Sequence, residues 1–562
     1  MIMKQRYFKH ILPAVLLTAA GLGMGSCVND LDIQPIDPQQ PAYNIDQNFA
    51  FAYSLLGSEG NLGLSSDEDK AGFYRTVFSL QEYPADGVIW QWQENAGIPA
   101  LTNLSWDNGT NIPEWAWLRL GYDVTQYNLL LGNLAGKDDA ESVRRRAEVR
   151  FLRALHYWYN LDLWGVAPVK EVFDNNNPVP KAGQELFDYI VAELKAVEPD
   201  LYAPGQAPFG RADRSACWLL LARLYLNAEV YTGTAHWAEA REYANKVLTD
   251  GYHHLTNNYK ALFMADNDVN MAVRPEIVFP IRQDGTRMKE ASSAAKFLVC
   301  ASRDGAKPVM PDLSSSTWNC LLLKSSTLLK FFPTLDDVPY LKPDDFKSDY
   351  ENFSRQEVIA FDREHGIGTD DMVAKAGDDR ALFYGGVGGG KHSVSNDRNG
   401  AQPTDNFAGD KGLRVVKWSN LRSDGKSASD PSDPDTDVPL FRTAEAQLIV
   451  AETYFREGNK AEAVKAIAAL QQMRNRKDLV TSAKLDADYL LDEWCREFYW
   501  EGRRRSDLRR FGKFTSSDYL WEWKGGVKEG RGVDDKYNTY PIPAQDYKDN
   551  PNYQGFGGTW YK

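Results

Sequence analysis

The sequence concentrates tryptophan in one polar, irregular segment, residues 88–117. Five of the 16 tryptophans lie there: Trp90, Trp92, Trp106, Trp115 and Trp117. Trp90 and Trp92 flank one glutamine, so on an extended chain both indoles would lie on one face, ~7 Å apart. An indole beside amide and guanidinium groups suits a sugar ring, which has C–H faces and a hydroxyl rim. We therefore predict an exposed sugar-binding surface at Trp90 and Trp92, with Asn95 close by.

The remaining tryptophans differ in their neighbours. Trp115 and Trp117 stand beside leucines at positions 118 and 120, so we expect them to pack against a helical body. Trp106 has no assignment from its neighbours. Trp318, isolated in SSSTWNC, is a second candidate for an exposed aromatic side chain.

Two zones with helical periodicity must position these residues, about 123–250 and about 440–512. Three expected helices share an Ala-x-x-Tyr pattern, beginning at Ala154, Ala222 and Ala451. A small residue followed by an aromatic one turn later is typical of the first helix of a tetratricopeptide unit. HWAEAREYANKVL and NKAEAVKAIAALQQMR follow as second helices. We predict three or four helix pairs that are separated in sequence and stacked in space.

Helical periodicity fades between these zones, where proline, glycine, serine and aspartate are frequent. Such a long irregular stretch on a rigid helical body is a natural binding surface. We therefore predict a mostly α fold with a loop-rich, irregular ligand-binding region at about 60–117 and 270–438.

Composition and motifs exclude several classes of function. The net charge of −14 argues against a nucleic-acid partner. The segment GGVGGGKHS has His392 where a phosphate-binding loop needs Ser or Thr, so we expect no nucleotide site. No nucleophile elbow, HExxH or CxxC motif is present, and we expect no enzyme. An outer-membrane glycoside hydrolase stays as an alternative, because a catalytic carboxylate pair has no sequence signature.

The N-terminus has the pattern of a lipoprotein export signal. Basic residues precede the apolar run ILPAVLLTAAGLGMG, and Ser26 stands directly before Cys27. We predict a signal peptide at 1–26, lipidation of Cys27, a tether at 27–45 and a folded body at 46–562. A plain secretory signal cut nearby is the alternative. Whether Cys300 and Cys320 form a disulfide stays open.

Seven segments give the chain a resemblance to the SusD/RagB family of outer-membrane lipoproteins. They are NDLDIQPIDPQ, WQENAGIP, GYDVTQYN, RFLRALHYWYNLDLWG, PDTDVPLFRTAEAQL, EFYWEGRRRSDLRRFG and YPIPAQDYKDNPN, and they extend from the lipidated cysteine to the C-terminus. WQENAGIP and GYDVTQYN resemble the starch-binding branch of the family more narrowly.

The resemblance implies about four tetratricopeptide-like helix pairs and a non-catalytic, cell-surface glycan-binding protein. Such a protein captures starch or maltooligosaccharides and caps a SusC-type TonB-dependent transporter in the outer membrane. The family's aromatic arc and its assisting arginine and asparagine would correspond to five residues here: Arg75, Trp90, Trp92, Asn95 and Trp318. Another glycan or a peptide is the alternative ligand.

The resemblance also marks one departure and one optional cofactor. The family has a tyrosine where this chain has Ser292, and Phe297 is the only aromatic nearby. The arc would then lack one wall, which would change its affinity or its preferred glucan. No cofactor is required, but a retained structural calcium site would involve Asp268 and Asp437, since aspartate oxygens suit calcium.

Overall fold

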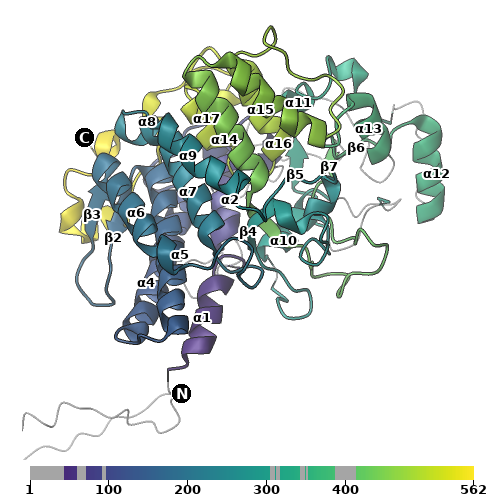
Figure 1. The fold of residues 1–562 in the computed structure, drawn as a ribbon. Helices are drawn as coiled ribbons and strands as arrows, with labels where there is room; N and C mark the ends of the chain where they lie inside the picture. Colours follow the sequence, from purple (N-terminus) through teal and green to yellow (C-terminus); the bar gives the residue numbers. More distant parts are fainter. Residues whose placement is uncertain are drawn as a thin grey trace, which may run out of the picture. The chain divides into compact units, whose positions relative to one another are not determined.

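The computed structural model describes residues 43–59, 71–90, 97–290, 292–303, 310–311, 317–341, 349, 352–386 and 413–561. The chain divides into two units, Met1–Asn44 and Ile45–Lys562, and the second holds all the elements below (Figure 1). The predicted signal peptide, Cys27 and nearly all of the tether lie outside the described residues. In the described part of the chain, no helix combines the length and apolar character that a membrane span requires.

The first helical zone extends from residue 111 to residue 248. It contains α4 (Asn111–Leu134), α5 (Ala140–Trp164), α6 (Gly183–Val197), α7 (Arg214–Leu226), α8 (Ala228–Thr232) and α9 (Trp237–Leu248). Neighbouring long helices pack in pairs, α4 with α5 and α7 with α9. The zone begins 12 residues before the predicted start at about residue 123, because α4 includes Pro113 in its first turn. A proline is tolerated there, since the first N–H groups of a helix have no partner within it.

The second helical zone contains α14 (Thr443–Arg456), α15 (Lys460–Met473), α16 (Ala487–Phe498) and α17 (Arg504–Arg510). The three pattern alanines, Ala154, Ala222 and Ala451, lie on α5, α7 and α14, and all three are buried. α14 packs against α15 and also against α9 of the first zone (Figure 1). The predicted stacking of paired helices that are distant in sequence is therefore confirmed.

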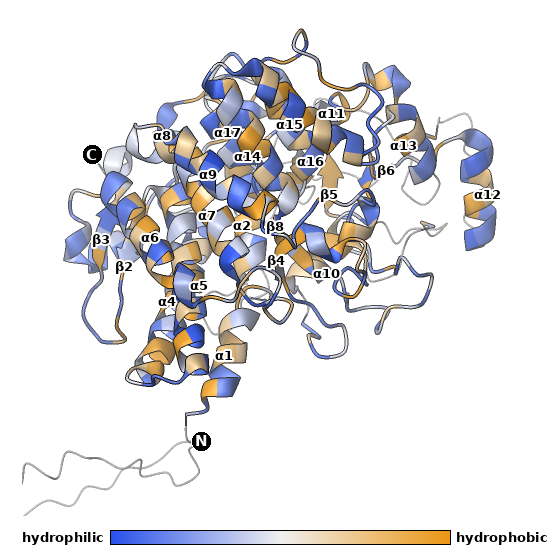
Figure 2. Cartoon of the chain, in the orientation of Figure 1, coloured by the Kyte–Doolittle hydropathy of each residue, from blue (hydrophilic) through white to orange (hydrophobic). Residues whose placement is uncertain are grey.

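The remaining segments contain short helices and paired strands. The α-helices are α1 (Ile45–Ser54), α2 (Phe73–Glu82), α3 (Ile98–Thr102), α10 (Ala294–Ala301), α11 (Ser325–Leu328), α12 (Arg355–His365), α13 (Thr369–Ala376) and α18 (Ala544–Asp549). The 3-10 helices are η3 (Glu198–Asp200), η4 (Lys260–Phe263), η5 (Arg274–Glu276), η6 (Leu335–Asp337), η9 (Lys524–Gly526), η10 (Asp535–Asn538), η11 (Pro551–Tyr553) and η12 (Gly558–Tyr561). In Figure 2, α12 is largely hydrophilic, which explains why its sequence shows no clear apolar stripe.

Each strand in the described residues pairs with one antiparallel partner. The pairs are β1 (Val88–Trp90) with β5 (Leu321–Leu323), β2 (Val166–Val169) with β3 (Val179–Ala182), β4 (Ile277–Ile281) with β8 (Val438–Arg442), and β6 (Phe383–Tyr384) with β7 (Arg414–Val415). The β1–β5 and β4–β8 pairs join segments far apart in sequence. The β4–β8 pair also connects the irregular region to the second helical zone, because β8 leads directly into α14.

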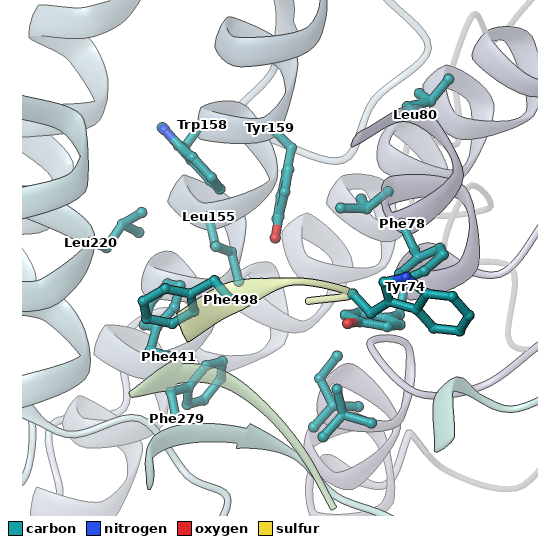
Figure 3. Packing of buried hydrophobic residues seen from close by; sticks show 14 of the residues in the cluster. Tyr74, Phe78, Leu80, Leu155, Trp158, Tyr159, Leu220, Phe279, Phe441 and Phe498 are labelled. Atoms are coloured by element: carbon teal, nitrogen blue, oxygen red, sulfur yellow. The ribbon is translucent and has the colours of Figure 1, made fainter. Parts of the chain in front are cut away.

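The main core lies where the helices meet the β4–β8 pair. Figure 3 shows Trp158 and Tyr159 of α5, Leu220 of α7, Phe279 of β4, Phe441 of β8 and Phe498 of α16 around one apolar interior. Tyr74 and Phe78 of α2 belong to the same cluster, and every residue of α2 is buried. A helix buried on all sides is rigid, so α2 can hold a functional side chain in a fixed position.

Candidate functional site

Two of the predicted site residues, Trp90 and Trp318, converge on the buried guanidinium of a third, Arg75. Arg75 comes from α2, Trp90 ends β1, and Trp318 lies just before β5. Trp90 pairs with Leu321 across the β1–β5 ladder, which brings the two indoles to the same place. The Arg75 Cζ lies 5.7 Å from the centre of the Trp90 ring and 5.6 Å from that of Trp318.

A third ring completes this group. Phe297, on α10, has its ring centre 5.1 Å from the Arg75 Cζ. Its ring stacks with that of Trp90 at 6.4 Å and lies 6.2 Å from that of Trp318. We name Arg75, Trp90, Phe297 and Trp318 the Arg75 cluster. Each contact between the cation and a ring face contributes about 0.5–2 kcal/mol, so the three rings together hold the guanidinium in place.

Ser292 supplies a polar contact to this cluster. The Arg75 Nη1 donates a hydrogen bond to the Ser292 Oγ at 2.5 Å, and the Ser292 N–H donates to the Glu59 Oε2 at 3.0 Å. Ser292 is only 1% exposed. At the position where the resemblance predicts a missing wall, the chain therefore has a group that orients the guanidinium. Sequence reasoning missed this role of Ser292, because Ser292 and Arg75 are 217 residues apart and no local pattern connects them.

The surface position predicted for Trp90 is wrong. Its side chain is 3% exposed, and its ring lies 5.6 Å from that of Tyr83. All three residues of β1 are buried because β5 covers the strand. Trp318 is only partly buried. Trp92 and Asn95 lie outside the described residues, so their binding roles stay predictions.

The other tryptophans of the opening segment are structural. Trp115 and Trp117 lie on α4 and are buried, which confirms the predicted packing against the helical body. The Trp117 Nε1 donates to the Asp546 Oδ2 at 2.5 Å. Trp106, which had no assignment, is buried between Tyr537 and Tyr540.

The four cysteines that the structure describes contribute no cross-link to the site. All four are buried, and none of them forms a disulfide: Cys217, Cys300, Cys320 and Cys495. The open question about Cys300 and Cys320 is thereby answered, since they form no disulfide. Burial raises the pKa of the Cys495 thiol to about 11, so that thiol is not a ready nucleophile.

The two predicted calcium ligands, Asp268 and Asp437, both form ion pairs with Arg282. The Arg282 Nη2 is 3.4 Å from the Asp268 Oδ2, and its Nε is 3.1 Å from the Asp437 Oδ2. The other oxygen of Asp437 accepts the Gln283 N–H at 2.6 Å. Nevertheless, the buried Asp437 Oδ2 accepts no hydrogen bond of good geometry among the described residues. Its partner among these residues is the Arg282 side chain, and carboxylate oxygens are also the ligands that calcium takes.

Electrostatics at this place also favour a cation. Burial raises the pKa of Asp437 to about 8, and the nearby carboxylates of Asp268 and Asp435 add to the increase. No group of three or more His, Cys, Asp or Glu side chains converges closely enough to hold a metal ion within the residues described. Backbone or water oxygens would therefore have to complete a calcium shell of six to eight ligands.

Solved structures define the class of fold. Surface glycan-binding protein A from Bacteroides thetaiotaomicron, in complex with laminarihexaose, superposes with a TM-score of 0.63 at 16% identity, over 90% of this chain and 97% of that chain. A SusD-like carbohydrate-binding protein from Bacteroides fragilis gives a TM-score of 0.65 at 16% identity, over 90% and 98%. The chain therefore has the SusD-like fold, and the predicted fold class is confirmed.

The sequence comparison identifies the family. Starch-binding protein SusD from Bacteroides thetaiotaomicron is 48% identical over 562 residues, or 98% of each chain. The model of the SusD family matches residues 370–557. The chain belongs to the SusD family, as its motifs predicted, and the glycan-binding proteins of this family are non-catalytic.

Proposed function

We propose that this protein is a non-catalytic receptor that captures α-glucan, as starch or maltooligosaccharides, at the cell surface. The observation that carries the proposal is the Arg75 cluster, in which β1–β5 pairing seats a guanidinium among three aromatic rings. Near-full-length similarity to a protein named for starch binding supports the choice of glycan.

In this mechanism, the three aromatic rings of the Arg75 cluster have different roles in binding. Trp318 is the partly exposed ring, and it stacks against a sugar face. Binding buries this ring, as it buries the aromatic anchors of other interfaces. Trp90 and Phe297 are buried, and they position the Arg75 guanidinium, which donates hydrogen bonds to sugar hydroxyls. Intrinsic affinity is modest, because hydroxyl groups give up hydrogen bonds to water on binding.

Delivery and anchoring complete the proposal. The captured glucan passes to a SusC-type TonB-dependent transporter of the outer membrane, and a lipid on Cys27 holds the protein at the cell surface. Family membership and the lipoprotein pattern at the N-terminus support these two statements. A structural calcium ion held by Asp268 and Asp437 is the one cofactor we propose, and it has no role in binding glucan.

Calorimetry with the purified protein and maltoheptaose tests the proposal. We expect Trp318→Ala to lower the affinity at least tenfold, equivalent to about 1.4 kcal/mol. Trp237→Ala is the matched control, because Trp237 is also partly buried but lies at the start of α9. It should leave the affinity unchanged.

Other outcomes would show which part of the proposed function is wrong. Heat with another glycan or a peptide, and none with maltoheptaose or cyclodextrin, would overturn the choice of α-glucan. Release of reducing sugar from starch by the purified protein would overturn the non-catalytic role.

A further inference from the structure

A second cleft lies on the helical scaffold and shares no residue with the Arg75 cluster. It has a volume of about 380 Å³ and is bordered by α4, α5, the β2–β3 pair and the C-terminal segment that contains α18 and η11. Ligand pockets in proteins usually measure roughly 300 to 1,000 Å³, so this cleft is large enough for a small ligand.

One buried polar group at this cleft has no partner. Asn160, on α5, is 2% exposed and lines the cleft. Its Nδ2 makes no hydrogen bond within the described parts of the chain. A buried amide without a partner costs about 1–3 kcal/mol, and a ligand that accepts its hydrogen bond removes that cost.

An acceptor faces the same space. Asp546 lines the cleft, and its Oδ2 accepts the hydrogen bond from the Trp117 indole. That bond fixes the carboxylate and leaves its second oxygen for a ligand. Burial raises the pKa of Asp546, which is consistent with a carboxyl group sheltered by the cleft walls.

The walls are largely aromatic and apolar. Trp117 and Tyr122 of α4 line one part, and Tyr553 of η11 lines another, with Pro168 and Pro178 of the hairpin between. Tyr122 is partly exposed and offers a ring near the opening. Flat apolar walls with one amide donor and one carboxylate acceptor match a sugar ring, which has both C–H faces and hydroxyls.

We propose that this cleft is a second carbohydrate site, which binds one or two sugar units of a glycan chain. An apolar peptide side chain would leave the buried Asn160 Nδ2 without a partner and would add nothing to the Trp117 contact of Asp546, whereas sugar hydroxyls can bond to both groups. The choice of an α-glucan here rests on the proposed function. The choice of a sugar rests on the cleft itself.

Gly121 offers a way to fill the cleft without disturbing the fold. It lines the cleft from α4, and a Cβ atom added there would meet no other atom within 4 Å. Gly132 lies on the same helix, also with no atom within 4 Å of an added Cβ, but it does not line the cleft. Gly121→Leu therefore blocks the cleft, and Gly132→Leu is its matched control.

Saturation-transfer NMR with maltotriose and the full chain tests the proposal in a Trp318→Ala background, where the Arg75 cluster is impaired. We expect saturation transfer to persist in Trp318→Ala and to fall about fivefold or more when Gly121→Leu is added, because leucine occupies the space of the sugar. Gly132→Leu should leave the signal unchanged. Circular dichroism checks that all variants are folded.

The outcomes separate this proposal from the first. If Trp318→Ala alone removes all transfer, or if Gly121→Leu has no effect on the remaining signal, the second site is refuted while α-glucan capture stands. If wild-type protein binds no α-glucan but binds another sugar that Gly121→Leu weakens, α-glucan capture is refuted and the second carbohydrate site stands. If no sugar binds in any variant, both proposals fail.

Discussion

The two ends of strand β8 hold buried charges in opposite ways. At its C-terminal end, Arg442 contacts three carboxylates at 2.7–2.9 Å: Glu276, Glu497 and Glu501. Arg474 also pairs with Glu276 and Glu497, and Lys417 pairs with Glu501. Just before its N-terminal end, Asp437 faces Asp268 and Asp435, and Arg282 is the cation that contacts it.

The difference shows which end is scaffold and which end suits a ligand. Cations and carboxylates balance around Arg442, and the pKa of Glu497 is held well below its usual range by Arg474 and Arg442 despite burial. Around Asp437, burial raises the pKa to about 8, and the two neighbouring carboxylates of Asp268 and Asp435 add to the increase against one cation, Arg282. A balanced cluster is complete by itself, whereas an excess of negative charge favours an added cation.

The largest expected effect is at the balanced end. Arg442→Met removes a cation that contacts three buried carboxylates, and uncompensated buried charge costs about 3–5 kcal/mol. We expect the free energy of unfolding, measured by urea denaturation, to fall by that amount. Arg287→Met is the control, because Arg287 is 85% exposed and should lose about 0.5 kcal/mol or less. A loss below about 1 kcal/mol for Arg442→Met would contradict the role of Arg442.

Glu82 represents an intermediate case, a buried carboxylate satisfied mainly by backbone groups. Its Oε1 accepts the N–H groups of Arg503 and Arg504 at the start of α17. Burial nevertheless raises the pKa of Glu82 to about 7. Between its ordinary pKa near 4.5 and this value, the folded state holds a proton that the unfolded state has released. Stability from this group therefore falls as pH rises through that window.

Glu82→Gln removes the titration and keeps an oxygen for both N–H groups. We expect the variant to gain stability over wild type as pH rises from about 5 to about 8, reaching on the order of 1–3 kcal/mol. Urea denaturation across this pH range measures the difference. Glu364→Gln, at an exposed position on α12, should show no such trend. A pH-independent difference for Glu82→Gln would show that Glu82 is ionised throughout.

Local patterns predicted the scaffold because the relevant contacts repeat along the chain. Ala154, Ala222 and Ala451 each stand one turn before a tyrosine, and this spacing is visible without any knowledge of the fold. The start of α4 was placed too late, because Pro113 and the surrounding polar residues resemble a loop. Helix α12 was missed, since its few buried residues give only a weak periodic signal.

The Arg75 cluster depends on contacts that no local pattern encodes. The polar neighbours of Trp90 predict an exposed side chain, but β5, more than 230 residues away, pairs with β1 and covers it. The hydrogen bond between Arg75 and Ser292 likewise spans 217 residues. The types of residue in the site were therefore visible in the sequence, whereas their burial and mutual orientation depend on tertiary pairing.

The smallest expected effect is at the end of β8 with excess negative charge. If calcium binds at Asp268 and Asp437, its removal leaves the Asp437 Oδ2 without a cation other than Arg282. Extracellular calcium sites have dissociation constants of roughly 0.1–1 mM, so about 2 mM calcium should stabilise the fold by about 1 kcal/mol. Thermal unfolding in calcium and in EGTA measures this difference.

Asp437→Asn separates a specific site from a general salt effect. The substitution removes one negative charge and a ligand oxygen, so the variant should unfold at the same temperature in calcium and in EGTA. Magnesium at the same concentration should give wild-type protein less stabilisation, because magnesium demands a stricter octahedral geometry. If calcium stabilises wild type and Asp437→Asn equally, the ion binds elsewhere. The excess charge at this end of β8 would then be neutralised by Arg282 and by the raised pKa of Asp437.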